Sequence, residues 1–163
     1  MPEYQTNQPS PQSLIKTISI IHLGLLAGQV MLGAVAFFLY KQTGFDIKTY
    51  NDPLLYLVPI VAITCAIVGN LLYKQLIAKL TDKNSLREKL TGHQTASITR
   101  FALLEGPSLF GIVAYMSKGN LFFLLISGII MLYFLSLRPT TEKVASDLNL
   151  SYEDKMELDS SIQ

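Results

Sequence analysis

Four long apolar runs alternate with polar segments along this chain. They cover residues 18–40, 54–76, 97–117 and 121–137. A helix needs roughly 20 residues to cross about 30 Å of hydrocarbon, and about 17 residues is near the lower limit. The pattern therefore predicts an all-α fold, an integral membrane bundle of four transmembrane helices. Because only a turn joins the last two runs, we expect the spans to form two antiparallel hairpins.

Polar segments flank and interrupt this bundle. Residues 1–14 are polar and rich in proline, which predicts a disordered N-terminal tail ahead of one membrane domain at residues 15–138. Before the third run, Ser85 and Glu88 have the spacing of a capping box, so we expect a short helix to start there.

The C-terminal residues 139–163 differ in character from the rest of the chain. A threonine start and apolar residues four apart predict a short amphipathic helix from Thr141. Six acids lie between Glu142 and Asp159. They leave two interpretations open, a solvated tail and a docking segment for a partner.

Lysine and arginine are distributed unevenly between the two sides of the expected bundle. Three of the 13 fall in the two connections opposite the termini, at Lys41, Lys48 and Lys118, and the other ten fall on the side of the termini. Cytoplasmic segments carry such an excess of positive charge. We therefore expect an integral protein of the plasma (inner) membrane with both termini in the cytoplasm. Its first partner is the lipid bilayer, and a net charge of +1 with no basic stripe argues against nucleic acid.

Small residues recur at helical spacing in the first two runs. Gly24 and Gly28 form a G-x-x-x-G pair, and Ala62, Ala66 and Gly69 share a face of the second run. Such residues let helices approach closely in lipid. Two interpretations remain open: the stripes pack the chain against itself, or they join copies in a homo-oligomer or larger membrane complex.

Glu105 is the only acid in any of the four runs. A charged and unpaired carboxylate in hydrocarbon costs from roughly 3 to more than 10 kcal/mol, so the residue requires an explanation. Gly106 and Pro107 predict a helix break that frees a carbonyl, and Ser108 adds a hydroxyl within the next turn. These groups together predict a proton or cation site.

Polar side chains of the first two runs are the candidate partners of this acid. They are Gln29, Asn70 and Thr64. The depth of Glu105 has two possible values at about 1.5 Å per residue. If the hydrocarbon begins at Phe101, the acid lies about 6 Å deep, whereas entry near Gln94 places it about 16 Å deep.

The sequence offers little support for soluble-type catalysis. It lacks the common hydrolase, zinc-protease and phosphate-loop motifs, so we expect no enzyme activity and no cofactor. Cys65 stands alone in the second run, and no metal site is expected. Of the two histidines, His22 is expected to make an interfacial hydrogen bond, and His93, beside a glycine in a polar segment, is expected to be solvent-exposed.

Residues 54–116 resemble the hairpin of the rotary ATPase proteolipids, the ring-forming c subunits. The resemblance rests on the small-residue helix, the polar basic loop and the run from Arg100 through Glu105 and Phe110-Gly111. It implies that Glu105 is the ion-binding acid and that Phe110-Gly111 is the pair that follows it in that family. The alternating glycines of the inner helix are missing, and Pro107 is not typical of the family.

Two classes of function therefore remain open. The first is a proton- or cation-binding, proteolipid-like membrane protein that uses Glu105. The second is an accessory or assembly protein in which Glu105 makes a structural hydrogen bond between helices.

Overall fold

The computed structural model describes residues 10–40, 44–45, 52–80, 83 and 85–160, and six helices account for most of them. The helices are α1 (Pro11–Leu39), α2 (Leu54–Ala78), α3 (Leu86–Lys118), α4 (Leu121–Ser136), α5 (Thr141–Asp147) and α6 (Tyr152–Ser160). These residues contain no strand beyond an isolated bridge between Gly44 and Asn120. The expected all-α fold is confirmed for this part of the chain.

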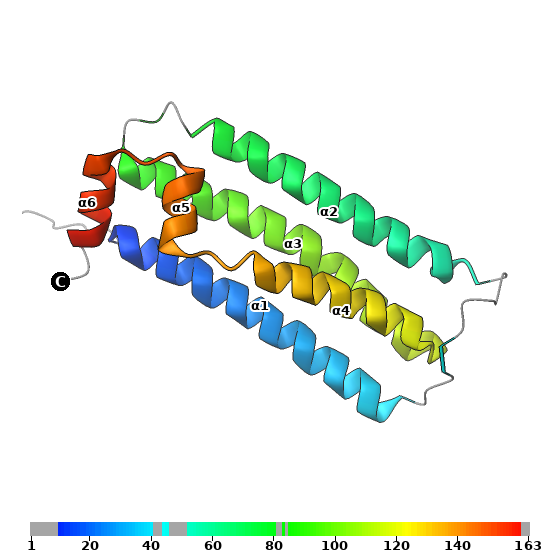
Figure 1. Cartoon of the computed structure of the whole chain (residues 1–163). Helices are drawn as coiled ribbons and strands as arrows, with labels where there is room; N and C mark the ends of the chain where they lie inside the picture. Colours follow the sequence, from blue (N-terminus) through cyan, green and yellow to red (C-terminus); the bar gives the residue numbers. More distant parts are fainter. Residues whose placement is uncertain (1–9, 41–43, 46–51, 81–82, 84, 161–163) are drawn as a thin grey trace, which may run out of the picture.

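The four long helices lie side by side, with α3 packed against the other three (Figure 1). α5 and α6 cover the end of the bundle where α1 and α3 begin, and this end is named the tail end here (Figure 1). α3 and α4 are joined by the expected tight turn. Gly119 ends α3 at φ +70°, and Asn120 caps α4 by accepting a hydrogen bond from the Phe122 N–H at 3.0 Å.

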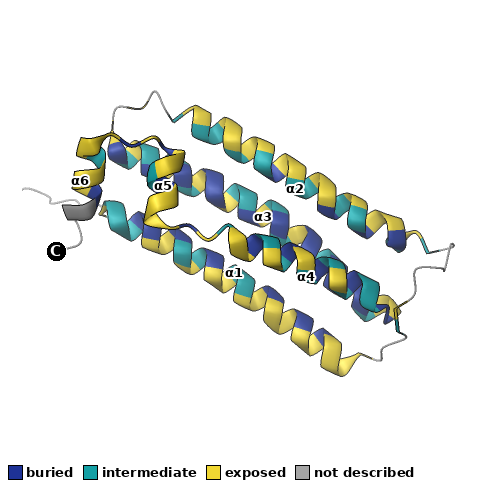
Figure 2. Cartoon of the chain, viewed as in Figure 1, coloured by how far each residue is buried: buried dark blue, intermediate teal, exposed yellow. Residues whose placement is uncertain are grey.

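Two helices in the described residues, α1 and α2, are long and apolar enough to cross a membrane. α4 and α5 meet at an 81° bend and form a third candidate if they are counted as one span. α4 alone has 16 residues, and α3 carries polar residues through its first half. Figure 2 shows exposed positions along the outer faces of α1 and α2, where large apolar side chains such as Phe38 and Ile60 lie. Apolar surface of this extent is typical of a membrane location.

The first helix begins earlier than the sequence pattern indicated. Ser10 is its N-cap and accepts a hydrogen bond from the Ser13 N–H, and Pro11 occupies the first turn. Leu14 and Ile15 are buried against the tail. The expectation of a disordered tail to residue 14 is therefore wrong for residues 10–14, and residues 1–9 lie outside the described part of the chain.

α3 is longer than expected and is not interrupted. The helix that begins at Leu86 is not short but continues to Lys118, so the third apolar run and the polar segment before it form one element. The helix break expected at Gly106 and Pro107 does not occur. A proline removes one helical hydrogen bond, and packing of α3 on three helices maintains the flanking turns.

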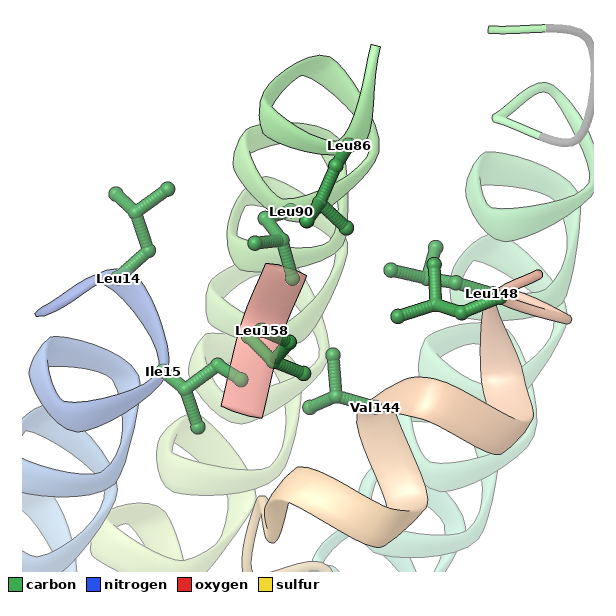
Figure 3. Close-up of a cluster of buried hydrophobic side chains, with 8 residues drawn as sticks. Leu14, Ile15, Leu86, Leu90, Val144, Leu148 and Leu158 are labelled. Atoms are coloured by element: carbon green, nitrogen blue, oxygen red, sulfur yellow. The ribbon is translucent and has the colours of Figure 1, made fainter. Parts of the chain in front are cut away.

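The C-terminal segment folds back onto the bundle. Side chains of α5 and α6 join those of α1 and α3 in one apolar cluster at the tail end, drawn in Figure 3. Its members are Leu14, Ile15, Leu86, Leu90, Val144, Leu148, Leu150 and Leu158. The helix expected from Thr141 is present as α5, whereas α6 was not expected. The tail is therefore not a fully solvated segment in the described residues, since it packs on the bundle of its own chain, and docking to a partner stays a prediction.

The two stripes of small residues lie in different surroundings. Ala62 is buried, and Gly69 of α2 faces the Leu103 side chain of α3, where an added Cβ would lie 3.5 Å from it. Gly24 and Gly28 are exposed, with no atom within 4 Å of an added Cβ. Among the described residues Gly24 and Gly28 face no other helix of this chain, because the buried face of α1 lies on the opposite side of the helix, and an interface between copies stays a prediction.

Candidate functional site

Glu105 lies near the middle of α3, about 28 Å from the first residue of the helix and about 20 Å from the last. Its side chain is half-buried, and the adjacent positions Ala102 and Gly106 are exposed. No hydrogen bond or ion pair joins Glu105 to any other described residue. The acid thus stands at the border between the buried and open faces of α3.

Two residues of the expected site, Gln29 and Ser108, are buried near Glu105 with unused polar atoms. Neither polar atom of the Gln29 amide has a hydrogen-bond partner in the described residues, and the same holds for Ser108 Oγ. α1 and α3 run parallel in one register, because His22 lies against Phe101 and Gly33 lies against Ile112. This register places Gln29 level with Ser108, about one turn beyond Glu105. We name Gln29, Glu105 and Ser108 the α1–α3 cluster.

The other two candidate partners lie elsewhere. Thr64 is exposed on the outer face of α2. Asn70 lies near the tail end, where both polar atoms of its amide contact Tyr133 Oη, at 2.7 Å from Nδ2 and 3.0 Å from Oδ1. The structure therefore brings Gln29 and Ser108 to the level of Glu105 and leaves Asn70 and Thr64 apart from it.

His22 makes a hydrogen bond inside the bundle. Its ring stacks on Phe134 with 4.6 Å between centroids, and Nε2 donates to the Phe134 carbonyl at 2.9 Å. It is fully buried on α1, so its partner is the backbone of α4 and not a group at the surface. This arrangement fixes the ring as a packing element between helices.

A second polar site lies at the tail end. It is a cavity of about 630 Å³ between α2, α3, the end of α4 and α5, and we name it the tail-end cavity. Its charged and polar lining residues are Asn70, Tyr73, Lys74, His93, Ser97, Arg100, Lys143, Asp147 and Asn149. Its apolar lining residues are Ile77, Ala78, Phe101, Leu137, Pro139 and Val144.

One wall of the cavity is a hydrogen-bonded chain that links three helices. Tyr73 Oη donates to Asp147 Oδ2 at 2.6 Å. Because this uses the only proton of the hydroxyl, Tyr73 Oη accepts a hydrogen bond from His93 Nε2 at 3.0 Å. On the other side of the ring, Ser97 Oγ donates to Nδ1 at 3.4 Å. These roles require a neutral imidazole with its proton on Nε2. Burial lowers the pKa of His93 below its usual value, and the Asp147 carboxylate opposes this shift in part.

Arg100 lines the tail-end cavity. Its Nη2 donates to Tyr133 Oη at 3.1 Å, and its guanidinium lies over the Tyr73 ring, 4.9 Å from the centroid. Its Nε is buried and has no partner among the residues that the structure describes. The aromatic contacts hold the guanidinium plane, and one of its N–H groups remains unused.

Sequence reasoning did not find the tail-end cavity. The expectation that His93 is solvent-exposed is wrong: the residue is 2% exposed, because α3 is helical at that point and α2 and α5 cover it. The four-residue spacing of His93 and Ser97 places them on one helical face, and this spacing indicates that the two side chains can form a hydrogen bond. Tyr73 and Asp147 are 74 residues apart, and only the folded tail joins them.

The described residues contain no group of three or more His, Cys, Asp or Glu side chains suited to holding a metal ion. No family model, no curated protein and no solved structure matches this chain. The chemistry of the two sites therefore rests on their own residues.

Proposed function

We propose that the chain crosses the membrane four times, through α1, α2, α3 and α4, with both termini in the cytoplasm. The side-by-side arrangement of the four helices supports this topology, and so does the excess of lysine and arginine toward the tail end. With Lys118 at the outer boundary, about 30 Å of hydrocarbon extends back to about residue 98. Glu105 then lies about 10 Å from the cytoplasmic boundary.

Within this topology, the proposed function is the uptake and release of a proton or small cation at the α1–α3 cluster. The observation that carries it is the set of unused polar atoms on Gln29 and Ser108, level with an acid that has no hydrogen-bond or ion-pair partner in the part of the chain that the structure describes. Each buried group without a partner costs about 1–3 kcal/mol, and folded proteins contain few of them. A hydrated proton or a small cation between these groups would offset that cost. The resemblance to the proteolipids, in which Glu105 corresponds to the ion-binding acid, points the same way.

The test is flux through the purified protein in liposomes that contain a proton- or sodium-sensitive dye. We expect the parent chain to conduct one of these ions and Glu105→Gln to reduce the flux to that of empty liposomes, because the amide cannot be ionised. Gln29→Leu should also lower it. Glu142→Gln, at an exposed acid in α5, is the matched control and should leave the flux unchanged. Equal flux in the parent and Glu105→Gln, or no flux in either, rejects the proposal.

An accessory role without transport is the second candidate. Glu105 makes no bond within the described chain, so a structural bridge from it must reach a second chain. An amide retains the size and hydrogen bonding of the acid, and Glu105→Gln should then preserve the complex. The particle mass in mild detergent tests a proteolipid-like ring, because a monomer or dimer excludes it.

A further inference from the structure

We infer that the tail-end cavity binds a phosphate group carried on a partly apolar molecule. The cavity is separate from the α1–α3 cluster, and no part of the proposed ion uptake uses it. Three permanent cations line it, Lys74, Arg100 and Lys143, against one carboxylate. That carboxylate, Asp147, already accepts the hydrogen bond of Tyr73. The cavity therefore carries an excess of positive charge.

Arg100 supplies the recognition element. Its Nη2 is oriented by Tyr133 and its plane by the Tyr73 ring, while the buried Nε has no partner. A guanidinium held in this way presents the fixed pair of N–H donors that binds phosphate through two parallel hydrogen bonds. An oxygen of the ligand that reaches Nε would pair a buried donor that has no partner among the described residues. Lys74, exposed at the rim, adds a second charge without a fixed geometry.

The remaining lining fits an apolar body attached to the phosphate. Phe101, Leu137 and Val144 are among the apolar lining residues, and the volume of about 630 Å³ is typical of a small-molecule site. Arg100 directly precedes the apolar stretch of α3 that starts at Phe101. In the proposed topology this level is the boundary of the hydrocarbon, where lipid phosphates lie. A phospholipid headgroup and a soluble organic phosphate share this chemistry and are distinguished by experiment.

The experiment measures binding to the purified full-length chain in an uncharged detergent. The probes are phosphatidylglycerol, diacylglycerol, which has the same chains but no phosphate, and glycerol phosphate, which has no chains. We expect phosphatidylglycerol or glycerol phosphate to bind and diacylglycerol not to bind. Binding of phosphatidylglycerol alone identifies a lipid site, and binding of both phosphates identifies a soluble-phosphate site. Equal binding of diacylglycerol and phosphatidylglycerol, or no binding of any probe, overturns the inference.

Variants connect binding to the cavity. Arg100→Gln should weaken phosphate binding by about tenfold or more, since hydrogen bonds to charged groups are strong. Lys79→Gln changes an exposed lysine of the same end outside the lining, and it should change the affinity by less than about twofold. If Arg100→Gln does not fold, Lys74→Gln at the rim should weaken binding by about threefold. Equal affinity in the Lys74→Gln, Lys79→Gln and parent proteins would place the ligand elsewhere.

Discussion

His93 shows how a single side chain connects three helices of this bundle. Its ring accepts from Ser97 on its own helix and donates to Tyr73 of α2, which in turn donates to Asp147 of α5. The arrangement requires the neutral imidazole, since a protonated ring has no acceptor for the Ser97 hydroxyl. Asp147 Oδ2 lies 3.7 Å from Nε2, and the charged residues Lys74, Arg100 and Lys143 line the same cavity.

This geometry predicts a loss of stability in mild acid. Burial lowers the pKa of His93 in the folded chain, so between its folded and unfolded pKa values the unfolded state binds more protons. The contribution of neutral His93 to the free energy of unfolding is then fully present above the unfolded pKa of about 6.5. It declines as pH falls through that value, by at most about 1.4 kcal/mol per pH unit. The measurement is the free energy of unfolding in detergent at a series of pH values. His93→Gln should remove this slope, and an unchanged slope contradicts the prediction.

At this scale the sequence indicates some of the candidate site residues and conceals others. Glu105 is recognisable without a structure, because an acid within an apolar run is costly wherever the helix packs. The roles of Arg100 and Tyr73 are not recognisable, because they depend on how α2, α3 and the tail are placed. The burial of His93 is not recognisable for the same reason, because its polar neighbours in the sequence do not show which later segments cover it.

At the scale of elements, α3 organises the molecule through close contact with its three neighbours. α3 approaches α4 closely at Gly111, where an added Cβ would overlap Ser127 Oγ and lie 3.1 Å from the Phe123 carbonyl oxygen. Gly106, on the same helix, has no atom within 4 Å of an added Cβ. Two glycines five residues apart therefore have opposite roles.

Alanine substitution at these glycines should give effects of opposite sign. Gly111→Ala forces α3 and α4 apart and should lower the free energy of unfolding by about 1–3 kcal/mol, as overpacking does. Gly106→Ala fills open space in a helix and should raise it by up to about 1 kcal/mol. Reversible unfolding in mixed micelles measures both variants. Equal effects at the two sites would show that backbone propensity, and not helix contact, determines the outcome.

The apolar runs predict the existence of the long helices better than their ends. Runs of this length can only be helical in lipid, so the four elements were found, together with the turn at Gly119. The sequence pattern does not predict the early start of α1, because a segment rich in proline and polar residues also favours disorder. Ser10 followed by Pro11 is nevertheless typical of a helix N-terminus. The sequence pattern does not predict α6, because its buried apolar residue, Leu158, lies among acidic residues.

At the scale of the whole molecule, the tail closes the bundle. Besides the apolar cluster of Figure 3, one ion pair attaches α6 to α3: Lys89 Nζ lies 2.9 Å from Asp154 Oδ2, and both side chains are largely buried. The Lys89 hydrogen bond lowers the pKa of Asp154 below its usual value. The stabilisation that the Lys89–Asp154 ion pair provides is present above the unfolded pKa of the aspartate, about 3.9, and is lost as pH falls below that value.

Asp154→Asn should loosen the tail at neutral pH. Loss of a charge-assisted hydrogen bond that is mostly shielded from solvent should cost about 1–2 kcal/mol of docking free energy. Hydrogen exchange of the α6 amides should become faster, while exchange in α2 stays the same. Glu153→Gln, at the adjacent exposed acid, is the matched control and should have no such effect. Equal exchange in both variants would show that the apolar cluster alone holds the tail.

The contact between the two ends of the chain also determines when the molecule can be completed during its synthesis. Gln12, in the first turn of α1, donates through Nε2 to the Leu158 carbonyl of the last helix at 3.2 Å. Val144, Asp147 and Asn149, which line the tail-end cavity, are likewise made after all four long helices. Without the residues after α4, Leu14 lacks its neighbours from the tail and the cavity lacks its lining from α5. The tail end can therefore close only after α5 and α6 have been made, which is later than all four long helices.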